Sequence, residues 1–269
     1  MKRIIGLGAE AHAAVLMELI ESAGAFDVSV VLNDDDSIQI RMVGEICVMS
    51  VDSSSEWIQR CAKEQNIQDF FMGLNSPRTR EKKRALFNHA IACGLKPLGI
   101  IHPKAMVSRT AKIGRGACIL AGSVVSTKSV LDDNVTVNIG ALVESHCRIR
   151  SHAQLGAGSF VGCGAEIGEC SYIGNGAQVQ PNVHIGENVV IAPGAFIDED
   201  IADGEDVQVE KRQLARHNGP NPDPVEGTFR ETRSTSLLKT VKSVFSLSPS
   251  ESKSGGLSET HREPDQIQA

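Results

Sequence analysis

The chain has 269 residues, 41% of them hydrophobic and 22% charged, which is typical of a globular protein and excludes fibrous and membrane-embedded classes. Its 27 Lys and Arg against 33 Asp and Glu give a formal charge of -6, so no basic surplus favours nucleic-acid binding. Glutamates at positions 10, 18 and 21 interrupt the N-terminal apolar stretch, and we expect no signal peptide, no transmembrane segment and a cytoplasmic location. Seven scattered cysteines without a Cys-x-x-Cys pair favour reduced, mostly buried thiols and no metal site.

Residues 1–98 alternate between strand and helix patterns. Apolar runs typical of strands occupy residues 3–7, 27–32 and 69–74. Helical spacing of apolar side chains occupies residues 12–22, 54–65 and 77–92. This order predicts a Rossmann-like α/β domain with a small parallel sheet. Ligands of such sheets bind at the carboxyl ends of strands, which directs attention to the loop at Gly8 and to His12 at the start of the first helix.

A six-residue period runs through the next predicted domain, residues 99–209. Sixteen aliphatic residues recur every six positions from Val107 to Ile197, and a small or β-branched residue stands two positions before each of them. An α-helix with 3.6 residues per turn would distribute these aliphatics around its circumference, whereas a coil of short strands directs all of them inward. We therefore predict a parallel β-helix whose successive coils bury one aliphatic column.

The last segment, residues 210–269, loses this pattern. It is poor in apolar residues and rich in Ser and Pro, so we predict a mostly disordered tail. One stretch, residues 236–245, has apolar side chains on a single helical face beside two lysines. It could be a short helix that binds a membrane surface or a partner, or a transient helix without function.

The repeats carry a family resemblance. Residues 101–125 and the VVIAPGAFI segment at 189–197 resemble the hexapeptide-repeat acyltransferases. The N-terminal order of strand, glycine loop, helix and acid-ended strand is similar to the branch with sialic acid O-acetyltransferases and UDP-amino-sugar N-acetyltransferases. The resemblance implies a left-handed parallel β-helix, a homotrimer with sites between subunits, and acetyl-CoA as co-substrate. It implies acetyl transfer to a sugar hydroxyl or amine in the biosynthesis of surface glycans or polysaccharides.

The same resemblance points to residues that would bind the substrate. They are Gly8 and His12 in the first loop and helix, and Asp34 and Asp35 in the acidic run after the second strand. The loop has Glu10 where backbone amides of the family approach a pyrophosphate, and a carboxylate there should repel that group. A nucleotide sugar and a sugar without the diphosphate therefore both stay open as small-molecule substrates.

Acetyl transfer from a thioester requires a base for the attacking group, and histidine suits this role near neutral pH. The family motif GAxxEHDC corresponds to GALVESHC at residues 140–147. Glu144 matches the family's glutamate, Ser145 stands in the place of its histidine, and His146 in the place of its aspartate. Either a local distortion lets His146 act as the base with Glu144 orienting it, which we favour, or the catalytic position has been lost.

The family's CoA groove follows the coils after the base. By resemblance, the CoA-binding residues here are Gln154, Gly156, Gly162, Gly164, Gly174, Ala192 and Pro193. His152, near the same corner, is expected to be a solvated surface histidine. The alternative to the acetyltransferase is a catalytically degenerate trimeric scaffold or a sugar-binding protein without affinity for acetyl-CoA.

Overall fold

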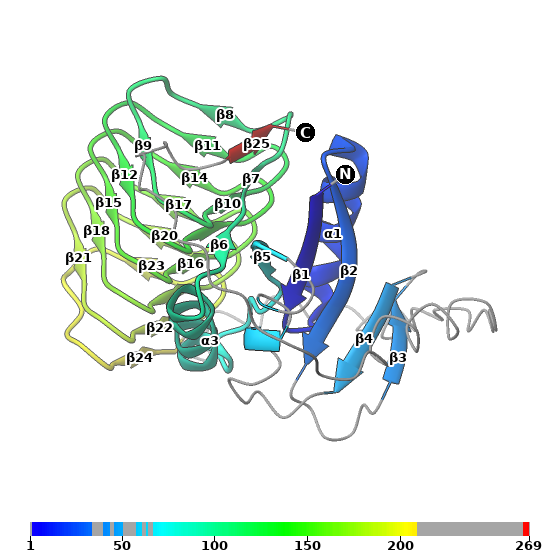
Figure 1. The fold of residues 1–269 in the computed structure, drawn as a ribbon. Helices are drawn as coiled ribbons and strands as arrows, with labels where there is room; N and C mark the ends of the chain where they lie inside the picture. Colours follow the sequence, from blue (N-terminus) through cyan, green and yellow to red (C-terminus); the bar gives the residue numbers. More distant parts are fainter. Residues whose placement is uncertain are drawn as a thin grey trace, which may run out of the picture.

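The computed structural model contains an α/β domain and a β-helix that lie side by side (Figure 1). It describes residues 2–33, 40–43, 46–50, 58–60, 63, 67–208 and 266–268. In this described part, no helix is long and apolar enough to cross a membrane. Of the helix predicted at 54–65, residues 58–60 and 63 are described and are helical. The stretch 236–245 lies outside the described residues.

A six-stranded sheet forms the centre of the N-terminal domain. Its order is β3 (Ile40–Val43), β4 (Ile46–Ser50), β2 (Phe26–Asn33), β1 (Lys2–Leu7), β5 (Asp69–Met72) and β6 (Lys96–Pro97). All neighbouring strands are parallel except β3 and β4. The Rossmann-like parallel sheet is thus confirmed, whereas the antiparallel edge strand was not predicted. Only residues 44 and 45 separate β3 from β4, which permits a hairpin but no parallel crossover.

Two helices cover opposite faces of this sheet. Helix α1 (Ala11–Ala23) buries Leu16 and Ile20 in one apolar cluster with β1 and β2. Helix α3 (Arg80–Ala92) packs on the other face, where the ring of Phe87 meets that of Phe70 edge-on with centroids 5.5 Å apart. Both helices follow the apolar spacing in the sequence, because a helix is held on a sheet by the stripe that it buries.

In residues 99–208, eighteen short strands build a three-sided parallel β-helix. Face 1 contains β7 (Gly99–Ile101), β10 (Cys118–Ile119), β13 (Thr136–Val137), β16 (Gln154–Leu155), β19 (Tyr172–Ile173), β22 (Val190–Ile191) and β24 (Asp206–Val207). Face 2 contains β8 (Met106–Val107), β11 (Val124–Val125), β14 (Leu142–Val143), β17 (Phe160–Val161), β20 (Gln178–Val179) and β23 (Phe196–Ile197). Face 3 contains β9 (Lys112–Ile113), β12 (Val130–Leu131), β15 (Arg148–Ile149), β18 (Glu166–Ile167) and β21 (His184–Ile185). We call the corners between them edges 1–2, 2–3 and 3–1.

The interior of the β-helix confirms the six-residue period. Residues eighteen apart pair in register, so Val125, Val143 and Val161 stack as one column. These aliphatics and the small residues two positions before them, such as Ala141 and Ala165, belong to one buried cluster. Parallel stacking therefore builds a continuous apolar core that needs few aromatic side chains.

Glycine often follows the inward aliphatic residue because the next coil approaches it closely. A Cβ atom on Gly168 would lie 2.2 Å from the carbonyl oxygen of Gly186 in the next coil. Positive φ occurs two residues later in the corner, for example at Cys170 and His152. Close approach of backbones, and not a left-handed conformation, therefore explains the glycines at these repeat positions.

Strand β25 (Gln266–Gln268), near the C-terminus, pairs in parallel with β7 at the end of face 1 (Figure 1). This strand lies within the segment predicted to be mostly disordered, and its pairing was not predicted. Residues 209–265 lie outside the described part of the chain.

The N-terminal domain docks on face 1 of the β-helix. The apolar cluster around α1 continues through Leu98 and Ile100 into the first two strands of this face. On α3, the ammonium group of Lys83 donates a hydrogen bond of 2.9 Å to the Thr136 hydroxyl on β13. Within the described part of the chain, face 1 is therefore largely covered by the α/β domain.

Candidate functional site

A cavity of about 440 Å³ lies where the α/β domain meets edge 1–2 of the β-helix. Its walls come from the start of α1, from the loop after β5 and from two corners of edge 1–2. The lining residues are Glu10, Ala11, His12, Val15, Asn75, Ser76, Leu120, Asn138 and Ile139. A volume in this range suits a small-molecule ligand. We call this cavity the interdomain pocket.

His12 lines the interdomain pocket from the first turn of α1. Its side chain is 9% exposed, and its Nε2 atom has no hydrogen-bond partner. Burial and the nearby Lys83 ammonium lower the pKa of His12 from 6.5 to about 3. The imidazole is therefore neutral near pH 7, so it can take part in hydrogen bonding to a ligand but brings no positive charge.

Gly8, in the loop before α1, does not line the interdomain pocket. It is buried with φ +88°, and a Cβ atom there would lie 2.4 Å from the side chain of Leu74. Glycine is required at this position by both conformation and packing. The two other predicted substrate residues, Asp34 and Asp35, lie outside the described residues.

Glu10 precedes α1 but does not cap it with its side chain. Its carboxylate instead accepts hydrogen bonds from the Asn75 backbone N–H, at 2.6 Å, and from the Thr79 hydroxyl, at 2.8 Å. These two bonds fix a negative charge at the wall of the interdomain pocket. The amide oxygen of Asn75, on the same wall, has no hydrogen-bond partner.

The predicted catalytic residues lie on a different corner, edge 2–3. One Glu144 carboxylate oxygen accepts a hydrogen bond of 2.8 Å from the Cys163 backbone N–H in the next coil. The Ser145 hydroxyl lies 3.3 Å from the Cys163 thiol. His146 is exposed at the corner, with φ +60°. Among the described residues no hydrogen bond joins Glu144 to His146, and the proposed role of this pair stays a prediction.

The predicted CoA-binding residues are distributed over two edges and one face. Gly162 and Gly164 belong to edge 2–3, beside the predicted catalytic residues. Four others follow face 1 along edge 1–2, namely Gly156, Gly174, Ala192 and Pro193. Gln154 lies on face 1, is 1% exposed, and neither atom of its amide group has a hydrogen-bond partner. Within one chain these residues do not form a continuous groove, and their role stays a prediction.

The expectation of a solvated His152 is wrong. This side chain is 5% exposed, its Nδ1 lies 3.0 Å from the Asn134 amide nitrogen, and its ring meets the Phe87 ring edge-on at 5.4 Å. Burial, together with Lys83 and other charges, lowers the pKa of His152 from 6.5 to about 4. The cause is the docking of α3 on face 1, which covers a corner that the β-helix alone would expose.

Lys83 is a residue of the interface that the sequence analysis missed. Its side chain is fully buried, and burial lowers the pKa of its ammonium group from 10.5 to about 8. The sequence did contain an indication of this buried lysine, because Lys83 lies on the same face of α3 as the buried residues Phe87 and Ala90. A lysine on an apolar stripe predicts a polar partner across the interface, which is Thr136.

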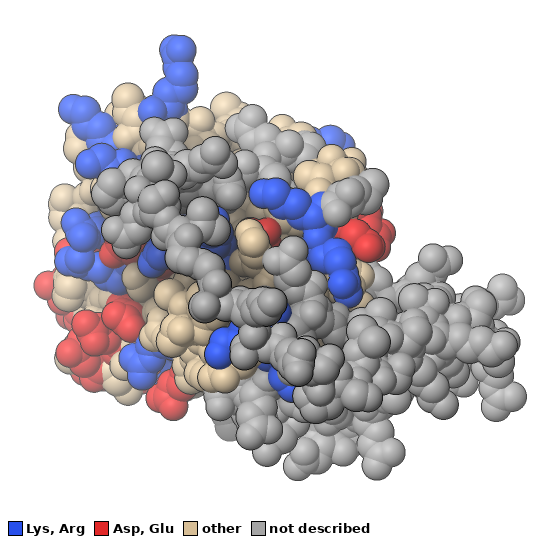
Figure 2. Space-filling model, in the orientation of Figure 1, with Lys and Arg blue, Asp and Glu red and all other residues tan. Residues whose placement is uncertain are grey.

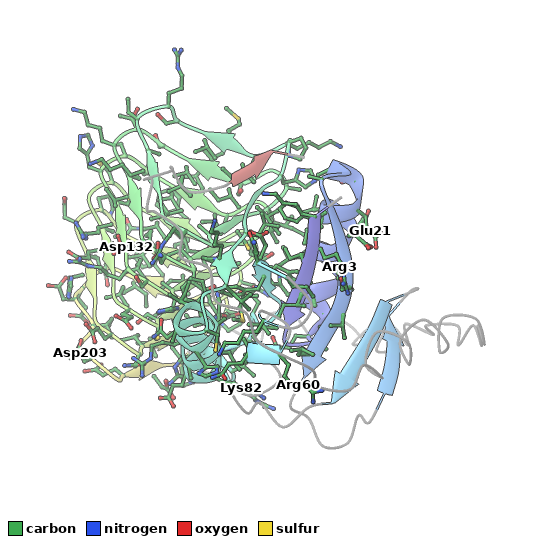
Figure 3. All side chains as sticks on the ribbon, in the orientation of Figure 1. Arg3, Glu21, Arg60, Lys82, Asp132 and Asp203 are labelled. Carbon is green, nitrogen blue, oxygen red and sulfur yellow. The ribbon has the colours of Figure 1, made fainter. Side chains whose placement is uncertain are left out.

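A second cavity, of about 540 Å³, lies on edge 3–1, away from every predicted site residue. Figure 2 shows acidic side chains gathered over this end of the β-helix, and Figure 3 places Asp132 and Asp203 on its outer side. Part of the charge is paired, since Arg150 donates a hydrogen bond of 2.6 Å to Glu166. His184 lines the same cavity, and its Nδ1 atom lies 3.9 Å from the second carboxylate oxygen of Glu166.

The fold defines the chain as a hexapeptide-repeat β-helix protein with an α/β domain docked on one face. A family model described as bacterial transferase hexapeptide (six repeats) matches residues 164–199. A search of curated proteins finds no match. Solved structures are similar to the chain over more of its length than the family model is.

A histidine mutant of perosamine N-acetyltransferase from Caulobacter crescentus, in complex with CoA and GDP-perosamine, is 27% identical, with a TM-score of 0.68. The alignment covers 76% of this chain and 91% of that chain. The acetyltransferase domain of PglB from Neisseria gonorrhoeae, in complex with acetyl coenzyme A, is 28% identical over 76% of this chain and 95% of that chain, with a TM-score of 0.65. WeeI from Acinetobacter baumannii AYE, at 18% identity, a TM-score of 0.59 and coverage of 77% and 97%, shares the fold. These findings confirm the resemblance to the hexapeptide-repeat acetyltransferases.

Proposed function

We propose that the protein is an acetyl-CoA-dependent acetyltransferase that acts on a sugar hydroxyl or amine. The observation that carries the proposal is the shared two-domain architecture, which extends over nine tenths of the length of relatives solved with CoA or acetyl-CoA. A sugar acetylated in this way would serve the biosynthesis of surface polysaccharides or other glycans. The use of acetyl-CoA favours a reaction in the cytoplasm.

The proposed reaction is a direct transfer between two bound substrates. The sugar oxygen or nitrogen attacks the thioester carbonyl, a base takes its proton, and CoA leaves with its sulfur. We assign the base to His146, which is exposed on edge 2–3 and free to meet a substrate. Glu144 holds the backbone of the next coil at Cys163, beside the predicted CoA-binding residues Gly162 and Gly164. The acceptor sugar is assigned to the interdomain pocket.

Face 2 supports a homotrimer. Its outward side chains include Met106, Leu142, Phe160 and Phe196, and Met106 and Phe196 are 69% and 59% exposed. Four of the five corresponding positions of face 3 carry charged or titratable groups, namely Lys112, Arg148, Glu166 and His184, and the fifth is Val130. An apolar sheet face of this extent is typical of a subunit interface.

A closed trimer would also join the two halves of the candidate site. The interdomain pocket lies on edge 1–2, and His146 lies on edge 2–3, so face 2 separates them within one chain. If three copies turn face 2 toward a common axis, edge 1–2 of one copy meets edge 2–3 of its neighbour. Each active site would then combine the sugar pocket of one subunit with His146 of another.

Phe160→Glu is expected to dissociate the trimer, because three carboxylates would be buried near the axis without partners. Sedimentation velocity should give a trimer for the unaltered protein and a monomer for the variant, with loss of most activity. Val130→Glu is the matched control, since it places the same charge at an outward position of face 3 and should remain trimeric. A monomeric unaltered protein, or a trimeric Phe160→Glu variant, would contradict the proposed assembly.

Release of the CoA thiol tests the function itself. Purified protein is incubated with acetyl-CoA and a panel of hexoses, aminohexoses, sialic acids and nucleotide-linked amino sugars, and the free thiol is measured together with the mass of the sugar product. We expect acceptor-dependent thiol release and a product heavier by one acetyl group. Acetyl-CoA hydrolysis that no sugar accelerates would count against the proposal.

A further inference from the structure

Strand β25 occupies one end of face 1. Its neighbour is β7, the first strand of the β-helix, with Gln266 opposite Gly99 and Gln268 opposite Ile101. Strand β24, the last of the β-helix, lies at the other end of the same eight-stranded sheet. Residues 209–265 therefore connect the two ends, and β25 returns to the coil where the β-helix begins (Figure 1).

The backbone of β7 has two sides, and β25 pairs with the side that the rest of the β-helix leaves open. The Ile100 N–H donates a hydrogen bond of 2.9 Å to the Ala117 carbonyl, on the side of β10. Successive backbone groups of a strand point to alternate sides, so the N–H and C=O groups of Gly99 and Ile101 face β25. In β25, Ile267 lies opposite Ile100, and its own N–H and C=O groups are therefore the ones that face β7.

Strand β7 differs from the other strand edges at the ends of the β-helix. All three of its residues are buried and none is charged. Strands β8 and β9 of the same coil have two residues each, and the exposed Lys104, Arg109 and Lys112 lie in or beside them. The last coil carries exposed acidic side chains such as Glu199 and Asp203. Charged side chains protect strand edges from pairing with other chains, whereas β7 has no charge of its own and is covered by β25.

We propose that β25 is a cap on the first coil of the β-helix, and that a second copy of the chain takes its place on β7 when the cap is removed. Two uncovered β7 strands match each other, because a two-fold axis places them antiparallel, with Gly99 of one copy opposite Ile101 of the other. Val107 and Ile113, at the same end of the apolar core, are only partly buried and add apolar surface to such a contact. This role for β25 goes beyond the proposed function and does not depend on acetyl transfer.

Two proline variants of the full-length protein test the cap. Ile267→Pro removes the N–H that faces β7, whereas Gln268→Pro, the matched control, removes an N–H that points away from it. Hydrogen exchange of the Ile101 amide is measured at micromolar protein concentration. We expect it to become at least about tenfold faster in Ile267→Pro and to stay unchanged in Gln268→Pro.

Sedimentation velocity from micromolar to submillimolar concentrations tests the pairing with a second copy. The mass of the Ile267→Pro assembly should rise with concentration to twice that of the unaltered protein, and a chain that ends at residue 265 should behave in the same way. In the associated form the Ile101 amide should again exchange slowly. The unaltered protein and Gln268→Pro should keep one mass throughout.

An unchanged exchange rate in Ile267→Pro would overturn the proposal, because β25 would then not cap β7. So would a constant mass of the chain that ends at residue 265, or an association in which the Ile101 amide stays unprotected. Failure of the proposed function has a different signature. A protein that shows the capping described here but does not bind acetyl-CoA would refute the acetyltransferase and leave the role of β25 intact.

Discussion

His146→Asn is expected to lower kcat for acetyl transfer by about 10²- to 10⁴-fold, the usual contribution of a general base. Asparagine removes the titratable group but tolerates the left-handed backbone that the corner requires at φ +60°. An alanine there would add backbone strain and confuse a loss of chemistry with a loss of structure. Because the imidazole acts on the proton of the attacking group, KM for acetyl-CoA should change little.

Lys128→Asn provides the control for this experiment. Lys128 occupies the same corner position one coil earlier on edge 2–3, with φ +58°, so the substitution makes an equivalent structural change outside the proposed site. We expect it to retain at least half of the activity. If His146→Asn also retains half of its kcat, the assignment of the base is wrong, and the second sequence interpretation, in which Ser145 marks a lost catalytic position, becomes the better one.

Acid is expected to destabilise the protein strongly between pH 6.5 and pH 4. His12 and His152 have folded-state pKa values of about 3 and about 4, against an ordinary value of 6.5. Between these values the unfolded chain binds two protons that the folded protein excludes, so the free energy of unfolding falls as the pH is lowered. At pH 4 each histidine contributes a loss of about 3 kcal/mol, which together is a large part of the stability of an ordinary domain.

Urea denaturation at a fixed protein concentration, repeated from pH 7 to pH 4.5, measures this effect. His12→Asn and His152→Asn should each remove about one proton from the pH dependence, even where lost packing lowers the stability at pH 7. The exposed His184→Asn variant controls for the loss of a histidine at the surface. An unchanged slope in both buried variants would show that neither histidine is kept neutral by the fold.

The β-helix could be predicted from the sequence because one physical requirement repeats in every coil. An aliphatic residue fills the interior, a small residue such as Ala141 or Cys147 fits beside it, and the period of six excludes a helix. The glycine that follows the inward aliphatic residue, as at Gly168, is explained by the close approach of the backbone of the next coil. Local and repeated constraints of this kind are visible in a single sequence.

The interface between the two domains could not be predicted in the same way. The burial of His152, the Lys83–Thr136 hydrogen bond and the interdomain pocket all depend on which face of the β-helix receives α3, and the six-residue period treats the three faces alike. The position of Glu10 was predicted to matter, but its bonds to the 75–79 segment join residues about 65 positions apart. Long-range docking of this kind leaves little trace in local patterns.

An acetyltransferase of this kind must bind acetyl-CoA whichever acceptor it uses, so this binding is the first property to measure. Equilibrium dialysis of the full-length protein against radiolabelled acetyl-CoA gives the affinity and the stoichiometry together. We expect saturable binding with about one site per subunit, because the sites of a closed symmetric trimer are equivalent. No bound acetyl-CoA at millimolar concentrations would contradict the proposed acetyltransferase.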